Sequence, residues 1–295
     1  MHQLTPRQIV LLVLLTVVWG VNWPVMKLGV TQYPALSFRA LSMLMGLPVL
    51  ALGLVVLKVP FRLPRKDWPE LLLLATTNMF VWHVCIILAV RTLSSGRAAI
   101  LGYTMPIFSA LIGALFFCAV LARRAWLGVG AAALGVLLLL WHEFSQLAGR
   151  PGGVALALLG AAAWALGTQL LRRTRIAAAT LTIAFWMTAL TTVVMCVLAT
   201  VFERDQWAMP NFTAWWTMVF NALLIFGFAH AAWFSLARSL PPVASTLSVM
   251  FIPVLGVFSG AAWLGESVHW QDWTAVALMV AAIASVLWPA RPAHA

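Results

Sequence analysis

Long apolar runs follow one another along almost the whole chain, and they constrain the fold more than any other feature. Ten runs are separated by short breaks rich in polar residues or proline, and their centres lie near residues 18, 47, 81, 108, 133, 161, 190, 225, 254 and 279. A helix needs about 20 mostly apolar residues to cross a bilayer. With 63% hydrophobic and 8% charged residues, one soluble core could not hide this apolar surface. The sequence therefore predicts an all-α membrane protein with ten transmembrane helices.

The chain also repeats itself at one fixed offset of 147 residues. Uncommon residues recur at this spacing, which carries more weight than general similarity in so apolar a sequence: His83 and His230, Arg91 and Arg238, Pro106 and Pro253, Trp126 and Trp273, Trp141 and Trp288. We interpret residues 1–145 and 146–295 as two structural copies. Five helices per copy is an odd number, so the second copy enters the membrane from the opposite side. Inverted five-helix repeats around a central cavity are typical of secondary transporters.

The basic residues fall mainly on one side of the predicted membrane topology. With the N-terminus inside, the cytoplasmic segments hold Arg7, Lys58, Arg62, Arg65, Lys66, Arg123, Arg124, Arg172, Arg173, Arg175, Arg238 and Arg291, and the outer loops hold Arg91, Arg97, Arg150 and Arg204. This bias predicts that both termini are cytoplasmic. The net charge of +11 is then a topology signal and a contact with anionic membrane lipids, so we expect no nucleic-acid partner.

The few polar residues inside the predicted helices are the candidate lining of a substrate cavity, since such groups are costly in lipid unless they face a cavity or a partner. In the first helix, Trp19, Trp23 and Lys27 recur at four-residue steps, and Asn22 lies close to that face. The alternative is that Asn22 bonds a neighbouring helix and Lys27 reaches the interface. Arg39, early in the second helix, is a candidate partner for a substrate carboxylate or for a lipid phosphate.

The third and eighth predicted helices carry the repeated histidines. Asn78 and Trp82 share a face of the third helix, with His83 offset by about 100° from Trp82, and His230 and Trp233 occupy the matching part of the eighth. A single intramembrane histidine is usually a packing group, but two related by the repeat favour a cavity. His83 could couple transport to protons, although the scarcity of membrane carboxylates weakens that idea. The remaining candidate lining residues are Tyr103, Trp164, Gln169 and Trp186.

Two prolines at equivalent places, Pro106 and Pro253, lie well inside apolar runs. Proline removes a backbone hydrogen bond and kinks a helix, so the pair are candidate gate residues; static curvature for packing is the alternative. We find no HExxH, GxSxG or phosphate-binding GKS or GKT loop. The cysteines lie in apolar runs without metal-ligand spacing. We therefore expect no enzyme activity, no metal and no cofactor.

Several motifs together resemble the drug/metabolite transporter superfamily in its ten-helix form with two EamA domains. They are Trp19-Gly20-Val21-Asn22-Trp23 with Lys27, Arg39, Leu93-Ser94-Ser95-Gly96-Arg97-Ala98-Ala99 leading to Pro106, and Leu240-Pro241-Pro242-Val243-Ala244-Ser245 through Pro253 to Leu264-Gly265-Glu266. The family often repeats Gly-Glu after the fourth helix, where this chain has Cys118-Ala119. Glu266 is therefore expected to have no counterpart.

The nearest resemblance is to bacterial inner-membrane exporters of aromatic amino acids, the YddG-like group. It implies ten helices around a central cavity and export of aromatic and other neutral amino acids, and of related metabolites or cationic drugs. We expect a monomer in the inner membrane that works by alternating access. One alternative is an organic-phosphate or nucleotide-sugar exchanger, although the cavity offers few basic residues beyond Lys27, Arg39 and Arg97. Another is a membrane enzyme or structural protein that transports nothing.

Overall fold

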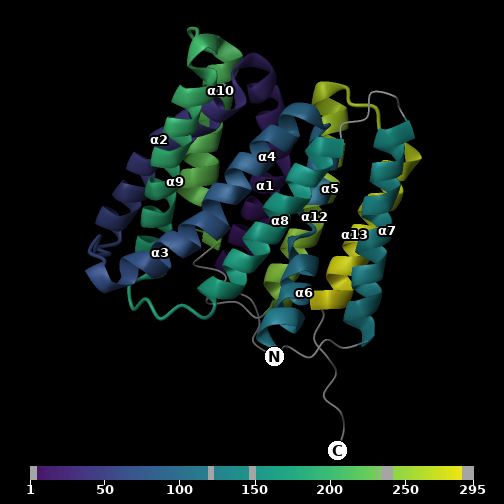
Figure 1. Cartoon of the computed structure of the whole chain (residues 1–295), viewed down its shortest axis with the longest axis horizontal. Coiled ribbons are helices and arrows are strands. Elements are labelled where there is room, and N and C mark those ends of the chain that lie inside the picture. The colour runs from purple at the N-terminus through teal and green to yellow at the C-terminus, as the bar shows by residue number, and fades with distance from the viewer. Residues whose placement is uncertain (1–4, 119–122, 146–150, 231, 234–241, 288–295) are drawn as a thin grey trace, which may run out of the picture.

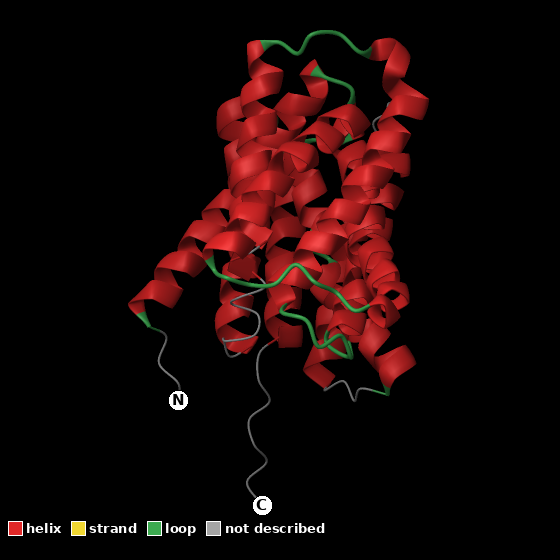
Figure 2. Cartoon of the chain, turned by 90° about the vertical axis from the view of Figure 1, so that its left-hand side faces the viewer, coloured by secondary structure: helices red, strands yellow, loops and turns green. Residues whose placement is uncertain are grey.

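The computed structural model describes residues 5–118, 123–145, 151–230, 232–233 and 242–287, and every regular element in these ranges is a helix (Figures 1 and 2). Its elements are α1 (Pro6–Gln32), α2 (Ala35–Val56), η1 (Arg65–Asp67), α3 (Trp68–Leu74), η2 (Ala75–Phe80), α4 (Val81–Thr92), α5 (Ser95–Gly102), α6 (Met105–Phe117), α7 (Arg123–Ser145), α8 (Pro151–Leu171), α9 (Thr180–Glu203), η3 (Arg204–Gln206), α10 (Phe212–Phe220), η4 (Asn221–Ala229), α12 (Pro242–Leu264) and α13 (Trp270–Leu287).

Seven helical segments in the described ranges are long and apolar enough to cross a bilayer, which makes the chain a multi-pass membrane protein. They are Gln8–Gln32, Ala35–Val56, Arg65–Thr92, Ser95–Phe117, Pro151–Leu171, Thr180–Gln206 and Phe212–Ala229. Two shorter apolar helices, Trp126–Leu138 and Phe251–Leu264, lie within α7 and α12. The helical class is as predicted, whereas ten spans and an inverted repeat remain predictions.

Large apolar side chains on the outside of the bundle face outward rather than into a core. Leu52, Val55, Phe116, Leu127 and Val201 each expose more than 60% of their surface. In water such a surface would carry a large hydrophobic cost, whereas the acyl chains of lipid are as apolar as these side chains. The distribution is that of a bundle whose helices face lipid on the outside and pack on one another inside.

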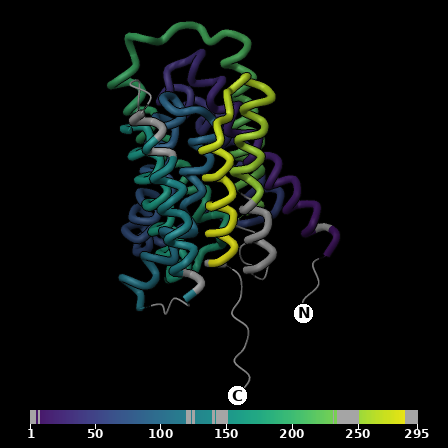
Figure 3. The backbone as a smooth tube through the Cα atoms, turned by 90° about the vertical axis from the view of Figure 1, so that its right-hand side faces the viewer, coloured from purple at the N-terminus to yellow at the C-terminus, as the bar shows by residue number. Residues whose placement is uncertain are grey.

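The most extensive helix contacts join the first half of the chain to the second. Helix α1 packs on α12, α2 on α9, α4 on α8, and α7 on α13. Figure 3 shows α13 and α12 lying along the same side of the bundle, with their long axes nearly parallel. The core is therefore shared by both predicted copies, and a site at its centre is built from both.

Local signals explain where several helices begin. Thr5 caps α1 in a capping box with Gln8, Ser94 accepts from the backbone N–H of Arg97 at the start of α5, and Asn211 accepts from that of Ala214 at 2.8 Å at the start of α10. Each polar side chain satisfies a backbone donor that has no partner within its helix.

The helix is broken near one of the two predicted kink prolines and continuous through the other. Pro106 lies in the first turn of α6, and the helix is broken at Tyr103 and Thr104 instead of being kinked. Proline has no N–H to offer the carbonyl four residues earlier, and its ring clashes with that group, so one helix becomes two. Tyr103 is accordingly at a helix end and not in the middle of a helix. Pro253 lies inside the continuous helix α12.

A close contact at Gly167 gives a stability test. A Cβ added there would lie 2.7 Å from backbone atoms of Asn78, which cannot move aside as a flexible side chain could. We expect Gly167→Ala to destabilise the fold by about 1–3 kcal/mol through overpacking, measured as a lower thermal unfolding midpoint in detergent. Gly53→Ala in α2 is the control, since a Cβ there has nothing within 4 Å. Equal midpoints for the two variants would contradict the packing of α8 on η2.

Candidate functional site

Two π-helical turns place the repeated histidines at the centre of the bundle. Helix η2 runs directly into α4 before His83, and η4 ends directly before His230. In these turns the N–H of Val81 donates to the carbonyl of Thr76, and that of His230 to the carbonyl of Ile225, each five residues back. Such wide turns are rare and occur frequently at functional sites. Residues 75–80 of η2, shifted by the 147-residue offset, fall within η4, and the centroids of the His83 and His230 rings are 6.1 Å apart.

Arg39 on α2 is buried in this centre, with 1% of its surface exposed. Its Nη1 donates to Oδ1 of Asn221 at 3.3 Å, and its Nη2 lies 2.7 Å from the sulfur of Met26. A thioether is a weak acceptor. No carboxylate in the described part of the chain lies within ion-pair distance of this guanidinium. A charge buried without an opposite charge is costly, so an anionic ligand would relieve the site.

Aromatic rings complete what we call the Arg39 cluster, made of Arg39, His83, Trp164, Phe226 and His230. The guanidinium carbon lies 5.6 Å from the centroid of Phe226. That ring is 5.3 Å from the His83 ring and stacks on His230 at 5.4 Å with an interplanar angle of 4°. Trp164 on α8 lies 6.5 Å from His230. The cluster thus combines one cation, two imidazoles and flat apolar faces, contributed by α2, α4, α8 and the η4 region.

Other predicted lining residues form aromatic pairs, one of which includes Trp164 of the cluster. Trp82 lies 5.3 Å from Trp164, Trp23 lies 6.3 Å from Tyr103, and Trp19 lies 5.4 Å from Trp233, measured between ring centroids. Asn22, Asn78 and His83 are buried. The described side chains at this centre pack against one another, so the open central cavity remains a prediction.

Three predicted residues have packing or capping contacts outside the Arg39 cluster. Lys27 donates from Nζ to the carbonyls of residues 90, 91 and 93 at the C-terminal end of α4. Gln169 bonds Ser109 on α6, and Trp186 donates to the carbonyl of Phe61 at 2.7 Å. These contacts occupy polar atoms of all three side chains, and a lining role for these residues stays a prediction.

The sequence analysis missed Asn221, Phe226 and Met26, which contact Arg39 directly. Asn221 carried a usable signal, because an amide inside an apolar run is costly unless it has a partner. Phe226 and Met26 are ordinary apolar residues in apolar runs, so nothing in their type distinguishes them. Only the packing of η4 and α1 against α2 identifies them.

Carboxylates cap helix N-termini at one end of the bundle, which we call the capped end: the end at which α2, α5 and α13 begin. There the Glu203 carboxylate accepts from the backbone N–H groups of Leu36 and Ser37 at 3.0 and 2.7 Å, and from the Ser37 hydroxyl at 2.8 Å. A carboxylate at a helix N-terminus satisfies unpaired donors and complements the helix dipole. The end of α9 is thereby tied to the start of α2.

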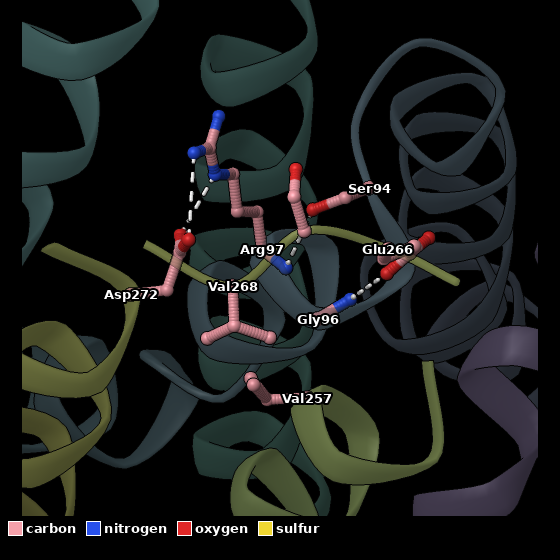
Figure 4. Close-up of a pocket in the computed structure, with 8 residues that line it drawn as sticks. Ser94, Gly96, Arg97, Val257, Glu266, Val268 and Asp272 are labelled. Atoms are coloured by element: carbon pink, nitrogen blue, oxygen red, sulfur yellow. Dashed lines mark hydrogen bonds and ion pairs between the residues drawn. The ribbon is translucent and has the colours of Figure 1, made fainter. Parts of the chain in front are cut away.

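Glu266 makes the equivalent contact at α5, as Figure 4 shows in part. Its carboxylate accepts from the Ser95 N–H and hydroxyl, both at 2.8 Å, and from the Gly96 N–H at 3.4 Å. Gly265 has φ +63°, a left-handed conformation that glycine adopts without strain, and it turns the chain after α12. The expectation that Glu266 has no counterpart is wrong, because Glu203 performs the same capping from a different sequence position.

An ion pair adds to the second contact. Arg97 Nε lies 2.8 Å from Asp272 Oδ1 across a small pocket that Ser94, Gly96 and Glu266 also line (Figure 4). Both carboxylate contacts and this ion pair join an element of residues 1–145 to one of residues 146–295. The capped end is therefore fastened by polar contacts between the two halves.

The fold and the cluster define a helical membrane protein with a buried polar and aromatic centre shared by both halves. A family model matches the chain twice, over residues 7–141 and 151–288, and its description is "EamA-like transporter family". The chain belongs to the EamA-like transporter family, which falls within the drug/metabolite transporter superfamily.

Curated relatives share this family character. "Uncharacterized inner membrane transporter YedA" of Escherichia coli (strain K12) is 27% identical, over 94% of this chain and 91% of the relative. "Uncharacterized transporter YoaV" of Bacillus subtilis is 23% identical, over 86% and 87%. A "Probable amino-acid metabolite efflux pump" of Salmonella typhimurium is 29% identical over 53% and 50%. A crystal structure of another protein matches with a TM-score of 0.67 at 19% identity, covering 93% of this chain and 96% of that one, which supports the fold.

The capping carboxylates give a second test. In Glu203→Gln one acceptor oxygen becomes an amide NH₂ facing N–H and O–H donors, and the charge is lost. We expect a loss of about 1–3 kcal/mol in stability, measured by thermal unfolding in detergent. Asp205→Asn, nearby on η3 and exposed, is the control and should leave the midpoint unchanged. Equal midpoints for the two variants would show that Glu203 does not hold α2.

Proposed function

We propose that the protein is a secondary transporter that exports amino acids, aromatic and other neutral ones, across the bacterial inner membrane by alternating access. It acts as a monomer in lipid, with ten spans in two inverted repeats and both termini cytoplasmic. The observation that carries the proposal is the buried guanidinium of Arg39, which has aromatic rings beside it and no carboxylate partner in the described residues.

Amino-acid chemistry fits this site. Arginine presents several N–H donors in a rigid fork that matches a carboxylate, so a substrate carboxylate would neutralise the buried charge. The flat faces of Phe226, His230 and Trp164 suit an aromatic side chain through offset or edge contacts. The Salmonella typhimurium relative, whose printed description is amino-acid metabolite efflux, supports the same substrate class over half of the chain.

The capped end supports alternating access. In an inverted-repeat transporter one half rocks against the other around a fixed site. The contacts of Glu203 with α2 and of Glu266 with α5 cross the two halves, so opening this end requires both sets of hydrogen bonds to break. Each contact is polar and can be replaced by water, which makes it reversible.

The same charges argue against the phosphate alternative. A phosphorylated sugar carries at least two negative charges and usually requires several cationic side chains. In the described structure Lys27 caps α4 and Arg97 pairs with Asp272, which leaves Arg39 as the cation of the cluster. One guanidinium matches a monocarboxylate.

Reconstitution tests the proposal. Liposomes with the purified protein, loaded with labelled phenylalanine, should release it with saturable kinetics and faster than protein-free liposomes. Unlabelled phenylalanine on the opposite side should drive counterflow of label, because a carrier returns loaded and a pore does not. No release above protein-free liposomes for any neutral amino acid would defeat the substrate claim, and release without counterflow would defeat alternating access.

A further inference from the structure

Among the residues that the structure describes, several buried polar atoms of the Arg39 cluster and of η2 have no hydrogen-bond partner. They are Nε of Arg39, Oδ1 of Asn78 and both ring nitrogens of His83. These residues expose 1%, 1% and 3% of their surface. A buried polar group without a partner costs about 1–3 kcal/mol, and such groups are rare enough in folded proteins that each requires an explanation. A ligand with both a hydrogen-bond acceptor and a donor would satisfy several of these groups together.

The unpartnered atoms divide into a donor pole and an acceptor pole. Arg39 on α2 offers an N–H and a positive charge. The Asn78 side-chain oxygen, on η2, is an acceptor, and a neutral His83 on α4 offers one acceptor nitrogen. Arg39 and His83 both contact the ring of Phe226, at 5.6 and 5.3 Å. Arg39 and His83 therefore lie beside the same aromatic ring of η4, and Asn78 lies on η2, which leads directly into the helix that carries His83.

The π-turn of η2 explains how Asn78 joins this site. In an α-helix, residues 78 and 83 point in widely different directions. The wide turn, in which Val81 N–H reaches back to Thr76, brings residues five apart towards one face. Asn78 also faces α8, because the backbone at Gly167 approaches it closely, and Trp164 lies one turn earlier on that helix. Asn78 is thus held beside the aromatic part of the cluster.

We infer that the site binds its substrate as a zwitterion at two separate poles, an inference that rests on the proposed export of amino acids. Arg39 binds the substrate carboxylate. Asn78 and His83 accept hydrogen bonds from the α-ammonium group, and neutral acceptors replace the carboxylate that amine-binding sites commonly use. A free amine would bring a second positive charge towards Arg39 and leave that residue unpaired. The substrate class is therefore α-amino acids, and the cationic drugs implied by the family resemblance are excluded.

Three ligands that share one phenyl group test the carboxylate site and the ammonium site separately. Phenylalanine has both charges, 3-phenylpropionate has the carboxylate only, and phenethylamine has the ammonium only. Binding to the purified protein is measured by competition with labelled phenylalanine and by thermal stabilisation. Asn78→Leu, close in size and without an acceptor, should weaken phenylalanine about tenfold or more and leave 3-phenylpropionate unchanged. Arg39→Gln should weaken both acids. Arg91→Gln, on an exposed arginine at the end of α4, should change neither.

A variant that gains binding shows that a loss of binding in Asn78→Leu is not caused by misfolding. Asn78→Asp places a carboxylate at the acceptor pole, so binding of phenethylamine should appear where the unmodified protein shows none. Equal losses for phenylalanine and 3-phenylpropionate in Asn78→Leu, or tight phenethylamine binding by the unmodified protein, would overturn the two-pole inference while leaving amino-acid export intact. If no ligand with a carboxylate binds, the proposed function fails together with the inference.

Discussion

The burial of Arg39, with no carboxylate partner among the described residues, is the physical constraint on which the rest of the structure depends. A guanidinium that is 1% exposed inside an apolar bundle needs compensation. Asn221, the sulfur of Met26 and the face of Phe226 supply only weak or neutral contacts. Charged groups inside membrane helices commonly face a cavity or bind a substrate or ion. In a transporter the compensation can arrive with each substrate and leave with it.

This constraint is met by packing that joins the two halves. Helix α2 carries Arg39 and packs on α9 and η4, so helices of residues 146–295 hold the guanidinium of Arg39 in position. The carboxylate of Glu203 holds the start of that same helix. Ser37 and Arg39 are two positions apart on α2, so a shift of the start of α2 that breaks the Glu203 contact would also move the backbone of Arg39. If Arg39 binds the substrate as proposed, opening of the capped end and release of the substrate would be linked through α2.

Much of this could be predicted from the sequence, for physical reasons that particular residues illustrate. Arg39, His83 and His230 are expensive in lipid, so their presence in apolar runs predicts a site, and the 147-residue offset relates the two histidines. The wide turns of η2 and η4 could not be predicted, since apolar periodicity does not reveal one extra residue in a turn. Phe226 could not be predicted either, because its role comes from neighbours distant in the chain. The carboxylate caps required knowing which helix ends meet.

The most direct test of the central claim is a distance measurement in lipid. Protein with ¹⁵N-labelled arginine guanidinium groups is reconstituted with phenylalanine carrying ¹³C at the carboxylate, and ¹³C–¹⁵N dipolar dephasing is recorded by solid-state NMR. We predict strong dephasing of the carboxylate signal that disappears in Arg39→Gln. Bound phenylalanine that shows no dephasing, or dephasing that persists without Arg39, would contradict the account.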